Sequence, residues 1–252
     1  MVWEDGASLT RQPLLPDYPM KRATAIVLAA GQSRRMGGVT AKTYLPIAGR
    51  LLVLRTLDRM FSAASVDGVV LVVAPDQIAE CESMLRADPA LRDRRWVLQA
   101  GGVTRQQSAK RGLERIESDV EIVIIHDGAR PFVSARLINR CVEVAAEQQA
   151  VVVGLPVRDT IKAVSEDHWI QTTPERSTLW EIQTPQVFKR ELIMAAYQRA
   201  ERESAQVTDD AMVVERLGIP VYVLEGERTN FKITVPDDVW LAEALIRDGR
   251  VP

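Results

Sequence analysis

The chain has 252 residues, and 32 Lys and Arg against 34 Asp and Glu give it a formal net charge of -2. This near-neutral balance argues against non-specific nucleic-acid binding. No apolar run reaches the roughly 20 residues that a membrane-spanning helix needs. We therefore expect neither a nucleic-acid partner nor a membrane partner.

The few cysteines and histidines exclude most metal and disulfide scaffolds. Cys81 and Cys141 are far apart and form no CxxC motif, so we expect neither a zinc cluster nor a disulfide framework. His126 and His168 are too few for a multi-histidine metal site. We expect both cysteines to be core residues and His126 to be a packed strand residue.

The N-terminal residues 1–22 are polar, are interrupted by proline and lack the apolar core of a signal peptide. We expect them to be a poorly ordered extension in front of a single domain over 23–250. A cytoplasmic location is the corresponding expectation.

The middle of the chain alternates between two patterns. Short apolar, β-branched runs without polar alternation predict strands that are buried on both faces, at 25–29, 69–73, 122–125 and 151–153, with a further strand near 96–99. Stretches with helical spacing lie between them, at 51–61, 104–116 and 134–147. Such alternation predicts an α/β fold, with a mostly parallel sheet and helices on both faces.

Residues 155–187 break this alternation because they carry no helical stripe. They predict short strands with turns at 165–167 and 173–174, and insertions of this length are usually functional or interfacial. We predict a β-arm at about 156–186 that projects from the main sheet. The rest of the chain predicts helices at 189–203, 209–217 and 237–247, and strands at 220–224 and near 232–235.

The first expected strand ends in a small, glycine-containing loop. Ala29, Ala30 and Gly31 let a ligand approach the backbone, whose N–H groups can hold phosphate oxygens. Arg34, Arg35 and Lys42 then add positive charge. The loop matches neither the Walker A pattern nor GxGxxG. A plain strand-to-helix turn with solvated arginines is the alternative at this point.

Two further strand ends carry candidate binding groups. Gly101 and Gly102 precede a helix that opens at Thr104, and a helix N-terminus favours anions, although an ordinary turn and cap would have the same sequence. Asp127 follows four apolar residues, where a carboxylate can bind Mg²⁺ together with substrate phosphates or can simply pair with Arg130. Since the carboxyl ends of parallel strands meet at one edge, we expect the three loops to converge there.

An ordered series of motifs resembles the 2-C-methyl-D-erythritol 4-phosphate cytidylyltransferase family, over about residues 23–247. The opening loop, with Ser33, Arg35 and Met36, is shared with many sugar-nucleotide pyrophosphorylase-type nucleotidyltransferases. The more specific motifs are Gly101-Gly102-x-x-Arg105-x-x-Ser108, His126-Asp127-x-Ala129-Arg130-Pro131, Pro156-Val157-Arg158-Asp159-Thr160-x-Lys162, Thr184-Pro185-Gln186, Thr208-Asp209-Asp210 and Asn230-Phe231-Lys232. The resemblance implies a Rossmann-like sheet of the nucleotide-diphospho-sugar transferase type with a projecting β-arm.

The resemblance also implies a reaction and its residues. The family joins CTP and methylerythritol phosphate, with Mg²⁺, to give CDP-methylerythritol and pyrophosphate. It implies nucleotide contacts at Ala29, Ala30, Gly31, Gly102, Ser108 and Asp127, with Asp127 also at the metal. It implies acceptor contacts at Arg130, Thr160, Arg176, Thr208 and Lys232, and catalytic roles for Arg35, Lys42, Arg176 and Lys232. Because Thr160 and Arg176 would reach the acceptor in another subunit, it implies a homodimer through the arm.

Three other functions remain open at this point, of which one is a nucleotidyltransferase that uses a different base. A ribitol-5-phosphate cytidylyltransferase resembles the sequence across most of the same motifs, but Arg158 and Arg176 on the arm favour methylerythritol phosphate. A nucleotide-binding regulatory module that has lost catalysis should lack Arg35, Lys42 or Asp127, and all three are present.

Overall fold

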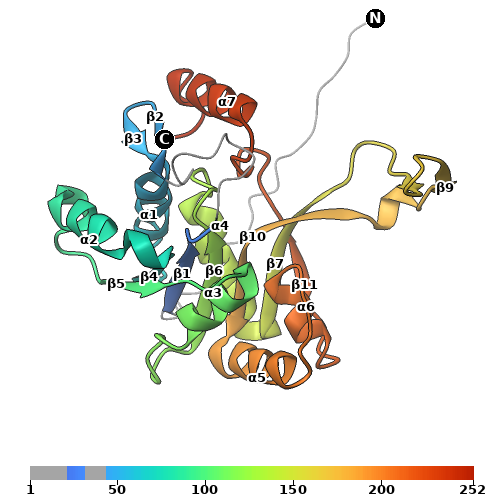
Figure 1. Ribbon diagram of the computed structural model, residues 1–252, viewed down its shortest axis with the longest axis horizontal. Helices are drawn as coiled ribbons and strands as arrows, with labels where there is room; N and C mark the ends of the chain where they lie inside the picture. Colours follow the sequence, from blue (N-terminus) through green and yellow to red (C-terminus); the bar gives the residue numbers. More distant parts are fainter. Residues whose placement is uncertain (1–21, 32–43) are drawn as a thin grey trace, which may run out of the picture.

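The structure is a computed structural model that describes residues 22–31 and 44–252. Its centre is a seven-stranded sheet in the order β11-β7-β10-β6-β1-β4-β5 (Figure 1). The strands are β1 (Ala23–Leu28), β4 (Val66–Val73), β5 (Trp96–Ala100), β6 (Ile122–Asp127), β7 (Ala150–Pro156), β10 (Trp180–Lys189) and β11 (Tyr222–Glu225). Only β10 runs antiparallel to its neighbours in this sheet.

The central strands β1, β4 and β6 are mostly apolar, which suits a sheet that helices cover on both faces. One face packs against α1 (Leu52–Ser62), α2 (Ile78–Ala87) and α4 (Ala135–Gln148). The other packs against α3 (Arg105–Leu113), α5 (Arg190–Arg202) and α6 (Asp210–Glu215). This arrangement confirms the predicted α/β architecture.

A smaller cluster joins the last helix to the sheet edge. The hairpin of β2 (Pro46–Ile47) and β3 (Arg50–Leu51) contacts α7 (Pro236–Arg247), and Ile47, Phe132 and Ile233 are buried together beneath that helix. No pattern in the sequence indicated this hairpin. No helix among the described residues is long and apolar enough to cross a membrane.

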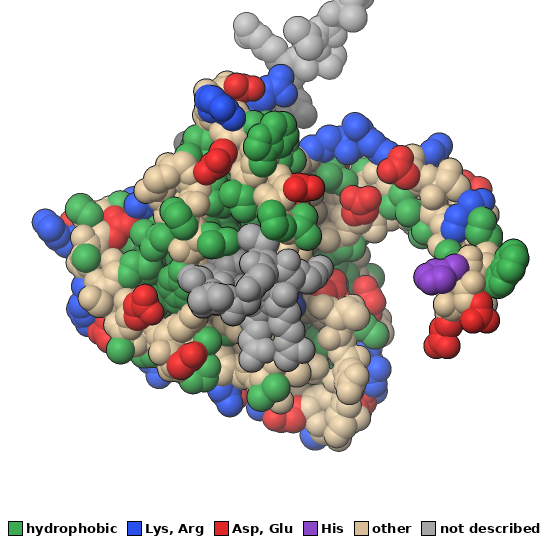
Figure 2. Space-filling model, turned by 45° about the horizontal axis from the view of Figure 1, so that its top comes forward, with side chains coloured by type: hydrophobic (Ala, Val, Ile, Leu, Met, Phe, Trp, Pro, Cys, Tyr) green, Lys and Arg blue, Asp and Glu red, His purple; other side chains and the backbone are tan. Residues whose placement is uncertain are grey.

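The predicted arm is present and extends away from the body of the molecule between β7 and β10 (Figures 1 and 2). It carries the short strands β8 (Ala163–Val164) and β9 (Ile170–Thr172), whose turn is closed where the His168 N–H donates to the Ser165 carbonyl at 3.0 Å. By Gln183 the chain is buried again in the main sheet. Since Trp180 already pairs with Pro156 of β7, the projecting part is 157–179.

The prediction of a strand near 232–235 is wrong. The segment pairs with no strand of the described sheet, and the Ile233 N–H donates instead to the Ala129 carbonyl of the loop after β6 at 2.9 Å. Ile233 turns into the small cluster under α7 instead of into a sheet. The predicted extension and the residues Arg34, Arg35 and Lys42 lie outside the described residues.

Candidate active site

Three loops meet at the carboxyl edge of the sheet, as the sequence predicts. The Gly128 N–H donates to the Leu28 carbonyl at 2.8 Å, and the Ala29 N–H donates to the Val72 carbonyl at 2.7 Å. The Gly101 N–H donates to the Val73 carbonyl at 2.8 Å. These bonds place the ends of β1, β4, β5 and β6 side by side.

Gly101 is the point of closest approach between two of these loops. A Cβ at this position would lie 2.4 Å from the Ala30 Cβ and 2.9 Å from the Ser108 Oγ, so a side chain would force the loops apart. Gly31 is exposed, and a Cβ at this position would meet no atom of the other described residues within 4 Å. The two glycine-containing loops therefore form one continuous surface on which a ligand can lie.

The second loop is fixed by side chains of the helix that follows it. The Ser108 Oγ accepts from the Gly102 N–H at 3.0 Å, and the Ser108 hydroxyl donates to the Thr104 carbonyl at 3.0 Å. Thr104 caps α3 by accepting from the Gln107 N–H. Ser108 is buried, so these hydrogen bonds fix the loop on the start of α3. Val103, which is 96% exposed, forms the apolar tip of the loop.

Asp127 lies at the centre of the site, at the end of β6, and three cations surround its buried carboxylate. Its Oδ2 lies 2.8 Å from the Lys232 Nζ and 3.9 Å from the Arg130 Nε, while its Oδ1 lies 3.4 Å from the Arg105 Nε. Burial alone would raise the pKa of Asp127, but the positive charges outweigh burial and hold this pKa well below its usual range. The carboxylate is therefore ionised throughout the physiological pH range.

Hydrogen bonds of Arg130 and Asn230 hold the loop before α7, which carries Lys232, next to this carboxylate. The Arg130 Nη1 donates to the Asn230 carbonyl at 2.8 Å, and the Asn230 side-chain amide donates to the Thr184 carbonyl at 2.8 Å. The buried Arg130 Nε and Asn230 Oδ1 have no hydrogen-bond partner among the described residues. Since unsatisfied buried polar atoms are rare, they are consistent with a place where a polar ligand binds.

His126 is a structural residue, as predicted, although it precedes Asp127. Its Nε2–H donates to the Arg130 carbonyl at 3.0 Å, and its Nδ1 accepts from the Thr184 hydroxyl at 3.1 Å. Burial lowers the pKa of His126 to about 4. The ring is neutral near pH 7 and both its nitrogens are used, so it has no free position for acid–base chemistry.

A divalent metal at this site would be held jointly by Asp127 and the phosphates of a substrate. The described residues contain no group of three or more His, Cys, Asp or Glu side chains that could hold a metal ion. Mg²⁺, however, is commonly bound by one or two carboxylates together with phosphates and waters. The single ionised carboxylate of Asp127 fits that mode, with Lys232 as its present partner.

The remaining candidates are not part of the cluster around Asp127. Thr160 and Arg176 lie exposed on the arm, where the Arg176 guanidinium donates to the Arg158 carbonyl at 2.7 Å. Thr208 is exposed just before α6, and its hydroxyl contacts the Met212 sulfur at 3.9 Å. A second subunit would be needed for the arm residues to meet a core site.

The sequence analysis assigned no role to several residues that build the site. Arg105, Thr184, Asp210 and Asn230 all stand in the quoted motifs, but their partners are distant in sequence. The signal that could have identified Arg105 is its place as the first residue of the helix after the Gly101-Gly102 loop.

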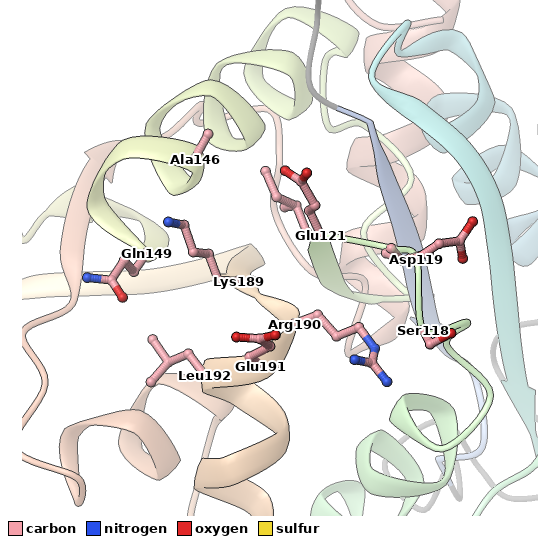
Figure 3. Close-up of a pocket in the computed structure, with 11 residues that line it drawn as sticks. Ser118, Asp119, Glu121, Ala146, Gln149, Lys189, Arg190, Glu191 and Leu192 are labelled. Atoms are coloured by element: carbon pink, nitrogen blue, oxygen red, sulfur yellow. The ribbon is translucent and has the colours of Figure 1, made fainter.

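A cavity of about 580 Å³ lies at the opposite end of β6, between the starts of β6 and α5 (Figure 3). Acidic and basic side chains both line it, including Glu121, Lys189 and Glu191. In an open parallel sheet, ligands bind outside the carboxyl ends of the strands, so this cavity is not the candidate active site.

Comparisons with known proteins show the family to which the chain is similar. Residues 23–248 match the family described as IspD: 2-C-methyl-D-erythritol 4-phosphate cytidylyltransferase. The enzyme of that name from Geobacillus thermodenitrificans is 42% identical over 223 residues, which cover 88% of this chain and 96% of the relative. The one from Alkaliphilus metalliredigens is 39% identical over 229 residues, which cover 91% and 95%.

Solved structures give the same result. A 4-diphosphocytidyl-2C-methyl-D-erythritol synthase from Anaerococcus prevotii aligns with a TM-score of 0.79 and 30% identity, covering 90% of this chain and 96% of its own. A 2-C-methyl-D-erythritol 4-phosphate cytidylyltransferase from Thermus thermophilus aligns with a TM-score of 0.74 and 35% identity, covering 90% and 99%. The chain therefore belongs to the 2-C-methyl-D-erythritol 4-phosphate cytidylyltransferase family.

Proposed function

We propose that this protein transfers CMP from CTP to 2-C-methyl-D-erythritol 4-phosphate, giving 4-CDP-2-C-methyl-D-erythritol and pyrophosphate in isoprenoid precursor biosynthesis. The observation that carries the proposal is the ionised Asp127 surrounded by Lys232, Arg105 and Arg130 at the carboxyl edge of the sheet. Such a cluster suits a reaction in which several phosphate groups must be held and their charge neutralised.

The chemistry needs no general base. The acceptor's own phosphate is already anionic near pH 7, and it attacks the α-phosphorus while the bond to pyrophosphate breaks. Positioning and charge neutralisation then dominate the barrier, which agrees with a neutral, fully hydrogen-bonded His126. We assign Lys232, with its side chain 36% exposed, to orienting the attacking phosphate.

The nucleotide and its metal take the surface formed by the first two loops. Ala29, Ala30, Gly31, Gly102 and Ser108 would position CTP, and Asp127 would hold Mg²⁺. When bound, Mg²⁺ would neutralise triphosphate charge and stabilise the leaving pyrophosphate. Arg35 and Lys42 would stabilise charge on the α-phosphate, and losing one such cation costs on the order of 3 kcal/mol, about a hundredfold in rate.

The acceptor site is completed by a second subunit in this proposal. Arg130, Thr208 and Lys232 would come from one chain, and Thr160 and Arg176 from the arm of its partner. Support comes from the arm itself, which extends away from the body and carries exposed Trp169 and Ile170 (Figure 2). We therefore propose a homodimer through the arm, working in the cytoplasm as the sequence predicts.

The test is pyrophosphate release from CTP and Mg²⁺, with methylerythritol 4-phosphate and ribitol 5-phosphate compared as acceptors. We expect strong preference for methylerythritol 4-phosphate, and the comparisons do not favour the ribitol alternative. Preference for ribitol 5-phosphate would keep the nucleotidyl transfer chemistry but overturn the assigned acceptor. No pyrophosphate with either acceptor, from protein that binds CTP, would contradict the enzyme assignment.

A further inference from the structure

One arginine links the candidate metal ligand to a second, deeply buried carboxylate. The Arg105 Nη2 lies 2.7 Å from the Asp210 Oδ2, while its Nε lies 3.4 Å from the Asp127 Oδ1. Burial would lower the pKa of Arg105, but Asp210 and Asp127 hold it above its usual value. The guanidinium is thus a permanent, forked cation between two carboxylates.

Asp210 is itself fixed from two other elements. It is fully buried, and its Oδ1 accepts from the Tyr197 hydroxyl of α5 at 2.6 Å. Its backbone N–H donates to the Gln186 Oε1 of β10 at 3.0 Å. Because neither end of Asp210 is free to move, the arginine bound to it is anchored at one end.

The two oxygens of Asp127 consequently have different surroundings. Oδ1 is contacted by the anchored Arg105, whereas the nearest partner of Oδ2 is Lys232 at 2.8 Å, whose long side chain is 36% exposed, with the Arg130 Nε farther away at 3.9 Å. The Lys232 ammonium sits on a flexible side chain and can move away from Asp127. The Arg105 guanidinium cannot move in the same way, because the buried Asp210 carboxylate holds it in place. Oδ2 is therefore the oxygen that can exchange its partner for a metal ion.

We propose that Arg105 is a positioning residue for the transfer reaction, which holds Asp127 Oδ1 through the buried Asp210–Tyr197 pair and so directs Oδ2 toward the metal. This inference rests on the proposed role of Asp127. The same bridge also joins the start of α3, which follows the Gly101-Gly102 loop, to the start of α6, which follows Thr208. It therefore ties the nucleotide side of the site to the acceptor side.

The test uses Mn²⁺ as a paramagnetic substitute for Mg²⁺, with its affinity measured in the presence of a non-reacting α,β-methylene analogue of CTP. Partners that orient a metal ligand typically change metal affinity or activity by about 10- to 100-fold when mutated. We expect Arg105→Lys to weaken Mn²⁺ binding and lower kcat by about tenfold each. The KM for the acceptor should change little. Arg199→Lys, in an exposed pair with Glu203 on α5, is the matched control and should change neither.

A double-variant cycle with Asp127→Asn shows whether Arg105 acts through that carboxylate. We expect Arg105→Lys to have little further effect on Mn²⁺ affinity or kcat in the Asp127→Asn background, since coupled residues are not additive. Fully additive effects would overturn the proposal. If Arg105→Lys does not fold, Tyr197→Phe removes only the hydroxyl that holds Asp210, and an unchanged Mn²⁺ affinity in that variant would overturn it as well.

The outcome also separates this inference from the function on which it rests. If Asp127→Asn leaves Mn²⁺ affinity unchanged, the proposed metal role of Asp127 fails and the Arg105 inference fails with it. If Asp127→Asn weakens Mn²⁺ binding but a folded Arg105→Lys does not, the proposed function stands and only the positioning role is overturned.

Discussion

Among single residues, Thr184 connects three others that build the site, although it carries no charge. Its Oγ1 accepts from the Asp127 N–H at 3.0 Å and donates to the His126 Nδ1 at 3.1 Å. Its carbonyl accepts from the Asn230 side chain at 2.8 Å. Thr184 is 5% exposed, so water cannot replace these bonds.

Replacing Thr184 by valine should therefore destabilise the fold. Valine keeps the shape but leaves the Asp127 N–H and the His126 Nδ1 without a partner, and an unsatisfied buried group costs about 1–3 kcal/mol. We expect a loss of about 2 kcal/mol in the free energy of unfolding, measured by urea denaturation. The control Thr172→Val, at an exposed position on β9, should change it by less than about 0.5 kcal/mol. Equal stability of wild type and Thr184→Val would contradict this prediction.

For single residues, the sequence predicted that Asp127 lies at a strand end and that His126 is a packed strand residue. Both follow from local pattern, because an acidic residue after four apolar residues marks the end of a buried strand. The sequence could not assign Thr184, because its partner Asp127 lies 57 positions away. Long-range hydrogen bonds of this kind depend on which strands become neighbours.

Among the elements, α3 lies unusually near the sheet. A Cβ on Gly112 would lie 2.5 Å from the Ile26 Cγ2 of β1 and 3.1 Å from the Val72 Cγ2 of β4. Glycine inside a helix costs roughly 0.5–1 kcal/mol relative to alanine. Here it permits a close contact that positions the N-terminus of the helix, with Arg105, at the site.

Gly112→Ala should destabilise the protein even though alanine favours helices. Overpacking a tight core costs typically 1–3 kcal/mol, which exceeds the gain of up to about 1 kcal/mol in helix propensity. We expect a net loss of about 1–2 kcal/mol by urea denaturation. In an Ile26→Ala background the new methyl group should be much better tolerated. Strictly additive losses in the double variant would show that the clash with Ile26 is not the cause.

The reactivity of the two cysteines reports how tightly α2 and α4 pack on the sheet. Cys81 and Cys141 are fully buried and unpaired, and burial raises the pKa of both thiols. Because the thiolate is the reactive form, we expect a thiol reagent at pH 8 to label neither cysteine in the native protein. Both should react in denaturant. Rapid labelling of one native thiol would mean that its helix opens readily.

The spacing of apolar residues predicted the types of the main helices and strands correctly, but it did not predict which element each apolar residue packs against. Helices α1, α3, α4 and α5 and the central strands fall where the apolar spacing predicts them. The segment 232–235 has strand-like spacing, yet its apolar residue Ile233 packs beneath α7. Spacing reports which side chains are buried, not whether a sheet or a helix buries them.

For the molecule as a whole, the arm is the surface that we propose to contact a second subunit. Trp169 is 76% exposed and Ile170 is 63% exposed near its end. Trp240 on α7 is similarly exposed, at 71%, and so provides an internal comparison. An apolar surface on a projecting hairpin is typical of an interface.

If the arm forms the proposed dimer, Trp169→Asp should separate the subunits and Trp240→Asp should not. A buried aromatic anchor contributes about 2 kcal/mol or more, and it occurs twice in a two-fold dimer. The dimer should therefore weaken by about 4 kcal/mol, or roughly a thousandfold. Sedimentation at micromolar concentration measures this change. A monomeric wild type, or an unchanged dimer in Trp169→Asp, would refute arm-mediated assembly.

The strand order of the sheet has a consequence for synthesis of the chain. β1, β4, β5 and β6 can assemble once residue 127 has left the ribosome, but the other neighbour of β6 is β10, which follows both β7 and the arm. During that interval β6, whose six residues are all buried in the finished sheet, has an open hydrogen-bonding edge. Open apolar edges pair readily with other chains. A nascent chain that stalls within the arm should therefore aggregate, whereas one released after Lys189 has already covered that edge.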